Sequence, residues 1–285
     1  MSILKEIVAN KQKEVLRRKN LISLSELESM PNFKKECLSF KEHLLNPEKL
    51  GIIAEFKRKS PSKGIINANA DVKDVSAGYQ AGGASAISVL TEIGYFNGSD
   101  IDLTNAKSVT SIPIIRKDFV VNIFQIAESK ALGADAILLI AEVLEKEQLC
   151  EYLAYAHEIG LQALIEVHGE LDLDKLPSAV QIVGVNNRNL NTFDVNLNHS
   201  TNMLNLLPKS VVKVAESGIT SVEDYLTLKQ IGFDAFLIGE FFMRNHNPGE
   251  ACLNFTNAIR GAITAAKGKD CSISARKVEI WARKG

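Results

Sequence analysis

The chain has 285 residues, of which 46% are hydrophobic, so it is long enough for one large barrel domain or for two smaller domains. A formal net charge of −1 gives no overall basic balance that would favour nucleic acid as a partner. Four widely separated cysteines without redox or metal-ligand spacing, and apolar runs too short to span a bilayer, favour a reduced, cytoplasmic protein with no membrane partner.

The first part of the chain shows helical spacing of its apolar residues and no strand pattern. One helical face would carry Ile3, Leu4, Ile7, Val8 and Val15, and residues 33–45 could form a second helix. We expect this N-terminal helical extension, about residues 1–48, to pack over one mouth of the barrel that the following segments predict.

Eight short apolar runs follow the extension, and we interpret them as strands. They cover residues 51–57, 85–91, 112–117, 136–141, 162–167, 181–186, 211–216 and 235–239. Most of these runs are rich in Ile, Val and Leu and do not alternate cleanly with polar residues. This pattern is typical of strands that are buried on both faces of a parallel sheet.

Helical patterns lie between the predicted strands, and glycines end three of them. Residues 123–132, 144–159 and 221–231 precede Gly133, Gly160 and Gly232. Asn122 is the expected N-cap of the first pattern, and Ser221 with Asp224 resembles a capping arrangement at the start of the last. Eight such units predict an α/β protein with the (β/α)₈ TIM barrel fold. We expect one barrel domain at residues 1–266, which includes the extension, and a mobile tail at 267–285.

The carboxyl ends of the strands form the active-site face of such a barrel, and here each predicted strand ends in groups that can bind a ligand or transfer a proton. These groups are Glu55, Lys57, Thr91, Glu92, Arg116, Lys117, Asp118, Glu142, Glu166, His168, Asn186, Asn187, Arg188, Glu216, Ser217, Gly218, Gly239 and Glu240. Lys57 and Lys117 would lie just inside the mouth, where buried cations are costly without carboxylates or a bound anion. Glu55, Glu166 and Glu216 are available partners, and such a mixture can provide an acid and a base in one pocket.

Glycines at the ends of the last two predicted strands indicate a phosphate site. Gly218 and Gly239 would let backbone N–H groups approach an anion at the usual phosphate position of this fold. Ser60 in the first loop and Arg188 in the sixth could complete it, whereas a lone glycine would indicate only a tight turn. The histidines show no metal-ligand spacing, and no nucleotide-binding motif occurs, so we expect neither a metal nor a cofactor.

The same segments resemble the indole-3-glycerol-phosphate synthase family of tryptophan biosynthesis over about residues 1–262. The matching stretches, in family order, are IIAEFKRKSPSKG, SVLTEIGYFNGS, IPIIRKDFVVNIFQI, GADAILLIAEVL, LIEVH, GVNNRNLNTF, VAESGI and LIGEFFMR. The resemblance implies a (β/α)₈ barrel with an N-terminal helical extension. It also implies a carboxy-lyase that converts a phosphosugar, 1-(2-carboxyphenylamino)-1-deoxyribulose 5-phosphate, to indole-3-glycerol phosphate, CO₂ and water.

The resemblance further implies roles for residues of the strand ends. Lys117 would be the general acid and Glu166 the second acid–base residue, with Lys57 and Glu55 as open alternatives for these steps. Lys57 would pair with the substrate carboxylate, while Glu55 and Asn186 would orient hydroxyl groups. The implied binding residues are Ser60, Gly218, Gly239 and Glu240 for the phosphate, Arg188, Glu216 and Ser217 for further contacts, and Phe96 and Phe119 for the anthranilate ring.

Two other functions compete with the synthase. A phosphoribosylanthranilate isomerase would need an acid and a base but neither a decarboxylation site nor the long helical extension. A non-catalytic phosphosugar-binding barrel would keep the glycines and Ser60 but would have no reason to keep Lys57 and Lys117 together with their carboxylates. We expect a monomer, because no apolar helix is left over to form an interface.

Overall fold

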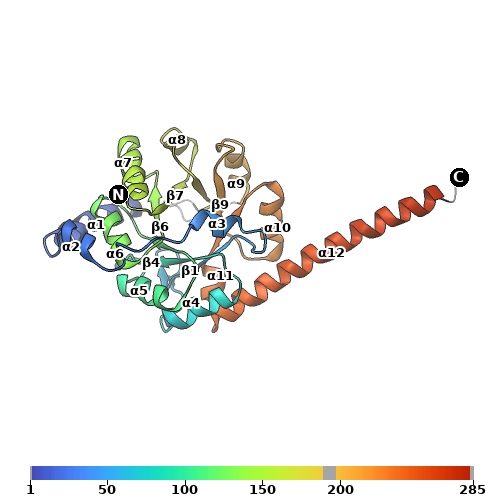
Figure 1. Cartoon of the computed structure of the whole chain (residues 1–285), viewed down its shortest axis with the longest axis horizontal. Helices are drawn as coiled ribbons and strands as arrows, with labels where there is room; N and C mark the ends of the chain where they lie inside the picture. Colours follow the sequence, from blue (N-terminus) through green and yellow to red (C-terminus); the bar gives the residue numbers. More distant parts are fainter. Residues whose placement is uncertain (1, 189–196, 283–285) are drawn as a thin grey trace.

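The computed structural model describes the backbone of residues 2–188 and 197–282 and the side chains of residues 2–188 and 201–266. Eight parallel strands close into a barrel in the order β1-β10-β9-β8-β7-β6-β5-β4 (Figure 1). They are β1 Ile52–Phe56, β4 Ala86–Leu90, β5 Ile114–Lys117, β6 Ala136–Ile140, β7 Gln162–Val167, β8 Ile182–Asn186, β9 Val212–Glu216 and β10 Ala235–Ile238. The predicted TIM barrel is confirmed. The largest shift of a strand start is at β5, which begins directly after Pro113, a residue without an N–H for the ladder.

Helices follow the strands and form the outer layer of the barrel (Figure 1). They are α4 Val72–Ala81, α5 Asp100–Val109, α6 Phe124–Leu132, α7 Lys146–Glu158, α8 Glu170–Leu173, α9 Leu197–Leu204, α10 Val222–Ile231, α11 Glu240–Met243 and α12 Pro248–Ala282. Ser221 and Asp224 form the expected capping box of α10, and Gly232 ends that helix in the left-handed conformation. The N-cap of α6 is Ile123 instead of the expected Asn122, whose side chain accepts a hydrogen bond from the Phe124 N–H at 3.0 Å.

The N-terminal extension contains three helices, α1 Ile3–Lys19, α2 Leu24–Ser29 and α3 Phe40–Leu45. The expected helix at 33–45 is therefore shorter, because Ser39 caps it only at Phe40, and α2 was not expected at all. Leu4 and Ile7 of α1 pack in the same apolar cluster as the inward-facing barrel residues, and so do Phe40 and Leu44 of α3.

The two ends of the extension cover opposite mouths of the barrel, so the prediction of a single covered mouth was wrong. Lys11 of α1 pairs with Asp118, which follows the carboxyl end of β5. The N–H of Lys41 in α3 instead donates to Gln162 at the amino end of β7, at 2.9 Å. The helix α1 therefore lies at the carboxyl mouth and α3 at the amino mouth, because the chain between them runs along the outside of the barrel (Figure 1).

The last helix, α12, begins against the barrel and continues far beyond it (Figure 1). Cys252, Phe255 and Ile259 of its first part belong to the buried core. The predicted tail at 267–285 falls partly within this helix, and its mobility stays a prediction. Over the described ranges, no helix has both the length and the apolar character that crossing a bilayer requires.

The first loop contains a small hairpin that the sequence analysis did not predict. Its strands are β2 Lys59–Ser60 and β3 Gly64–Ile65, which pair in antiparallel fashion. Arg58, directly before the hairpin, is held by both carboxylate oxygens of Asp102 on α5, at 2.5 and 3.0 Å. The hairpin thereby positions the turn Ser60–Gly64 above the carboxyl end of β1.

Candidate active site

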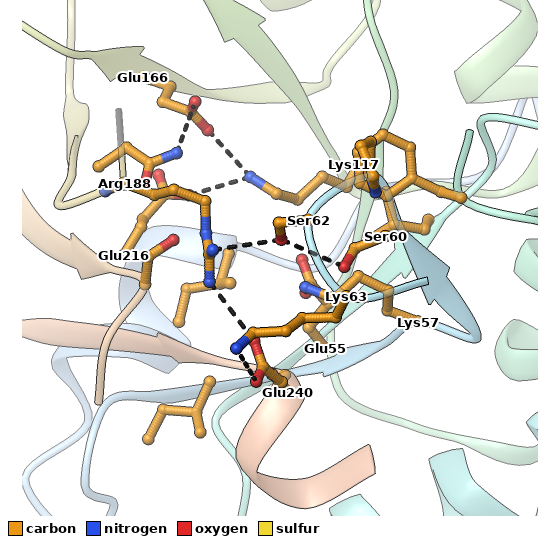
Figure 2. A pocket seen from close by; sticks show the side chains of 18 of the residues that line it. Glu55, Lys57, Ser60, Ser62, Lys63, Lys117, Glu166, Arg188, Glu216 and Glu240 are labelled. Atoms are coloured by element: carbon orange, nitrogen blue, oxygen red, sulfur yellow. Dashed lines mark hydrogen bonds and ion pairs between the residues drawn. The ribbon is translucent and has the colours of Figure 1, made fainter. Parts of the chain in front are cut away.

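A cavity of about 510 Å³ lies at the carboxyl ends of the barrel strands (Figure 2). The residues to which the sequence analysis assigned a catalytic or binding role all line it. They are Glu55, Lys57, Ser60, Phe96, Lys117, Phe119, Glu166, Asn186, Arg188, Glu216, Ser217, Gly218, Gly239 and Glu240. Residues from separate strands therefore converge on one hollow, as a common function would require.

Lys117 is the cation that joins the carboxylates of two strands. It is the last residue of β5, and the alternation of a strand turns it into the barrel while Arg116 points outward. Its Nζ lies 3.0 Å from Oε2 of Glu166 and 2.9 Å from Oε2 of Glu216 (Figure 2). Burial alone would lower the pKa of Lys117, but the nearby charges of Glu166, Glu216 and Glu55 outweigh it and raise that pKa. Lys117 is therefore protonated at neutral pH and can donate a proton.

Glu166 and Glu216 share this lysine, yet their pKa values move in opposite directions. Burial raises the pKa of Glu216 to about 7, since the charge of Glu166 partly cancels the attraction of Lys117. Burial also opposes ionisation of Glu166, but Lys117, His168 and Asn186 hold its pKa well below the usual range. The pair therefore offers an ionised carboxylate beside a carboxyl group that can hold a proton near neutral pH.

Glu55 and Lys57 form a second ion pair at the end of β1. The two-residue period of a strand places both on the barrel side, and the Lys57 ammonium contacts the Glu55 carboxylate (Figure 2). Gly239 makes room for this pair, because a Cβ built on it would lie 2.9 Å from Cβ of Glu55. The glycine was expected to serve a phosphate, and the structure gives it this packing reason as well.

Another part of the cavity lining gathers groups suited to an anion. Ser217 and Gly218, directly after β9, have φ angles of 66° and 81°, a left-handed conformation that is uncommon for serine. Arg188 reaches across from the end of β8 and donates to Oγ of Ser62 at 3.2 Å and to Glu240 of α11 at 3.4 Å (Figure 2). The first loop, the end of β8 and the start of α11 thus meet at one place.

An apolar wall faces these charged groups. The rings of Phe96 and Phe119 lie with their centroids 6.1 Å apart. Ile3, Leu4 and Ile7 of α1 also line the cavity. A ligand with an aromatic ring and an anionic group could therefore place each end against a matching surface.

Two strands contribute apolar instead of polar residues to the cavity, so the expectation of eight polar strand ends around one pocket was wrong. Of the residues named for these ends, Thr91, Glu92, Arg116, Glu142, His168 and Asn187 are not part of its lining. The strands β4 and β6 contribute Leu90, Leu138 and Ile140 instead. Arg116 points outward and pairs with Glu128 of α6 at 2.8 Å, because inward and outward positions alternate along β5. Within the described residues, no group of three or more His, Cys, Asp or Glu side chains could hold a metal ion.

The comparisons with known proteins agree with this geometry. A family model described as Indole-3-glycerol phosphate synthase matches residues 4–255, a range that contains every barrel strand. The chain belongs to the indole-3-glycerol phosphate synthase family. A relative with this name from Bacteroides thetaiotaomicron is 43% identical over 258 residues, which cover 90% of this chain and 99% of the relative. Another from Alkaliphilus metalliredigens is 40% identical over 249 residues, which cover 87% of this chain and 95% of the relative.

Solved structures outside the synthase family share its barrel. KGPDC from Streptococcus mutans has a TM-score of 0.54 at 11% identity, covering 73% of this chain and 96% of its own. A chain of the tryptophan synthase a2b2 complex from Pyrococcus furiosus has a TM-score of 0.51 at 13% identity, covering 74% of this chain and 97% of its own. At such low identities the similarity concerns the fold alone.

The sequence analysis of this synthase-family chain missed part of the cavity lining. Ser62 and Lys63 follow Ser60 in the same loop, and both line the cavity, with Lys63 Nζ 3.9 Å from a Glu240 oxygen. Their presence in the SPSKG stretch was the available signal. The apolar face of α1 was recognised, but nothing in its periodicity indicates that Ile3, Leu4 and Ile7 face a ligand cavity in addition to the core.

Proposed function

We propose that this cavity catalyses the ring closure, decarboxylation and dehydration of 1-(2-carboxyphenylamino)-1-deoxyribulose 5-phosphate to indole-3-glycerol phosphate. One observation supports this most strongly. Lys117 contacts Glu166 and Glu216 in a cavity that has a phenyl wall and, elsewhere, Arg188 with Ser62 and Ser217. The substrate carries an aromatic carboxylate and a phosphate, so it matches this division of the lining.

Binding would first bring the two reacting carbons together. The anthranilate ring would lie against Phe96 and Phe119, and the phosphate would lie near Arg188, Ser60 and the backbone after Ser217. Lys57 would pair with the carboxylate of the ring. Fixing both ends of a flexible substrate removes much of the entropic cost of ring closure.

Lys117 would then act as the general acid. It would give its proton to the C2′ carbonyl oxygen while the ring carbon that bears the carboxylate attacks C2′. The C–CO₂ bond would break next, and its electron pair would restore the aromatic ring. Such general acid catalysis contributes a factor of about 10²–10⁴ to the rate.

Dehydration would complete the reaction with Glu166 as the base. Lys117 would first regain a proton from water, because loss of CO₂ from a carboxylate consumes one proton overall. Glu166 would then take the proton from C1′ while the C2′ hydroxyl leaves with a proton from Lys117, giving the indole double bond and water. Because Lys117 Nζ lies 3.0 Å from Glu166, the proton can return from the base to the acid. Lys57 and Glu55 are the alternative acid and base, and single substitutions of each residue will distinguish the assignments by their effect on kcat.

The test of this function is direct. Purified protein mixed with the carboxyphenylamino substrate should give the fluorescence of an indole product. Consumption of phosphoribosylanthranilate without indole formation would favour the isomerase. Binding of the synthase substrate without turnover would favour the non-catalytic barrel.

We further propose that the protein acts as a cytoplasmic monomer. The free cysteines Cys37, Cys150 and Cys252 suit a reducing compartment, which supports the cytoplasmic location. The monomer is proposed because the sequence leaves no apolar helix over to form an interface. Light scattering on the purified full chain tests the oligomeric state, and a mass of twice the chain would contradict the monomer.

A further inference from the structure

His168 lies behind the candidate base, on the side that does not line the cavity. It follows the last residue of β7, and its imidazole is mostly buried between two carboxylates. Nε2 lies 3.1 Å from Oε1 of Glu166, and Nδ1 lies 3.6 Å from Oε2 of Glu142. None of the predicted roles uses this residue.

We propose that His168 is a positioning residue whose positive charge holds Glu166 ionised and directed at Lys117 during turnover. The proposal rests on the proposed function, because it concerns the base of that reaction. His168 acts through Glu166 and does not touch the cavity, so it is not itself a catalytic residue.

The surroundings of His168 favour the charged imidazolium. Three carboxylates face it, namely Glu166 on β7, Glu142 after β6 and Asp172 on α8. The Asp172 side chain also accepts a hydrogen bond from the backbone N–H of His168 at 2.8 Å. The nearby ammonium of Lys175 is directed to the carbonyl oxygens of Ala141 and Leu144, at 2.8 and 3.2 Å. Burial lowers the pKa of His168, but the carboxylates outweigh it and raise that pKa above its ordinary value.

The ring nitrogens of His168 are stabilised by the negative charges of the nearby carboxylates. Among the described residues, neither nitrogen forms a well-aligned hydrogen bond, although both are buried. A neutral imidazole would leave two buried polar atoms without compensation. An imidazolium is attracted to both carboxylates without strict alignment, so the geometry itself favours the protonated ring.

Glu166 is held from three directions. Lys117 Nζ contacts its Oε2 at 3.0 Å, and Asn186 Nδ2 donates to Oε1 at 3.0 Å. His168 approaches the same Oε1 from outside the cavity. When Lys117 gives up its proton, His168 becomes the remaining positive neighbour of Glu166, so the carboxylate stays ionised when it must accept a proton.

Two substitutions separate charge from shape. His168→Gln keeps an amide donor near Glu166 but removes the charge, and His168→Ala removes both. Without the charge, we expect the acid limb of the kcat–pH profile to move to higher pH by about one unit. At a pH below the acid limbs of both the parent and the variant, kcat of the variant should then be about tenfold lower. KM should change little. His157→Gln on α7 is the matched control, and its limb should stay in place.

A titration without substrate tests the pairing by itself. The ring signals of His168, followed by NMR against pH in the full chain, should show a pKa above 6.5 that falls in Glu166→Gln. An unchanged His168 titration in that variant would overturn the pairing. Product formation with an unmoved acid limb in His168→Gln, or an equal loss of kcat at every pH, would overturn the positioning role alone. Absence of product from the wild-type protein would instead overturn the proposed function, whatever the NMR titration shows.

Discussion

At the scale of single residues, the site depends on how three strands arrange one ammonium and two carboxylates. Lys117 contacts Glu166 and Glu216, and all three side chains are largely removed from solvent. Water cannot screen the charges, so each one changes the proton affinity of the others. A substitution at any of the three will therefore alter both chemistry and titration.

Replacing Lys117 by methionine should remove the general acid while keeping most of the side-chain volume. We expect kcat to fall by a factor of about 10²–10⁴. The protein should stay folded, because Glu216 can take up a proton when its cation is lost. Product fluorescence and circular dichroism measure the two effects, with Lys73→Met on the exposed face of α4 as control. Equal turnover in Lys117→Met and the parent would show that another residue is the acid.

Glu216 should make the protein less stable as the pH rises from 5 to 8. Its pKa of about 7 in the folded protein exceeds that of an unfolded glutamate, so the folded state binds the extra proton in this window. Its stabilising effect is present at pH 5 and is lost through pH 7, on the order of 3 kcal/mol. His168, with a raised pKa, acts in the same direction, whereas Glu166 titrates below this window.

Urea denaturation at several pH values measures this dependence. The free energy of unfolding should decline less between pH 5 and 8 in Glu216→Gln than in the parent protein. Glu223→Gln on the exposed face of α10 should decline as the parent does. Parallel curves for Glu216→Gln and the parent would contradict a raised pKa at this position.

At the scale of elements, a buried cluster of charges ties α1 to the carboxyl mouth of the barrel. Lys11 Nζ lies 2.8 Å from Glu14 and 3.0 Å from Asp118. Two turns further along α1 from Lys11, Arg18 pairs with Glu128 of α6 at 2.6 Å and with Asp100 of α5. These contacts hold the helix whose first residues form part of the cavity wall.

Lys11→Met should weaken this attachment, because it leaves Asp118 buried without one of its two cations. We expect the free energy of unfolding to fall by about 3 kcal/mol and KM to rise as the wall loosens. Urea denaturation and steady-state kinetics measure both, and the control is Lys13→Met, an exposed lysine of the same helix. Adding Asp118→Asn to Lys11→Met should recover part of the loss. A loss no greater than that of Lys13→Met would contradict the attachment.

The predictability of each element follows from how local its signal is. The barrel strands were predicted within one or two residues because buried parallel strands are continuous apolar runs, such as AILLI in β6. The hairpin β2–β3 was missed because two-residue strands carry no periodicity. The placement of α1 and α3 at opposite mouths depends on contacts such as Lys11 with Asp118, which are far apart in the sequence.

The same distinction holds for the site. The position of a residue at a strand end indicates that it can reach the cavity, and this was sufficient for Lys117 and Glu166. The position at a strand end does not indicate whether the polar residue points into the barrel. For this reason Glu142 and Thr91 were expected in the pocket, although they lie outside its lining. His168 was also named at a strand end, but its role through Glu166 becomes visible only from the distances between side chains.

At the scale of the whole molecule, the barrel and its N-terminal extension form the unit that is shared with relatives. The Bacteroides relative aligns over 99% of its length, and the family match ends at residue 255, within α12. The side chains of α12 that are buried against the barrel lie in the first part of this helix, and Phe255 and Ile259 are among them. The part of α12 that follows residue 255 therefore lies outside the family match.

Removing residues 267–285 should leave kcat and KM within about twofold of the parent, and the melting temperature should change by only a few degrees. Product fluorescence and thermal unfolding measure these effects. A second truncation before Phe255 is the contrasting variant, and it should unfold at a clearly lower temperature because buried side chains are lost. Loss of activity on removal of residues 267–285 would contradict the prediction that this segment is not needed for catalysis.

The lining contributed by Ile3, Leu4 and Ile7 has a practical consequence for anyone who handles the protein. The amino end of the polypeptide is part of the working surface of the enzyme, whereas the carboxyl end projects away from it (Figure 1). Affinity tags and fluorescent fusions belong on the carboxyl end. An amino-terminal fusion would lie next to the part of the cavity that Ile3, Leu4 and Ile7 line.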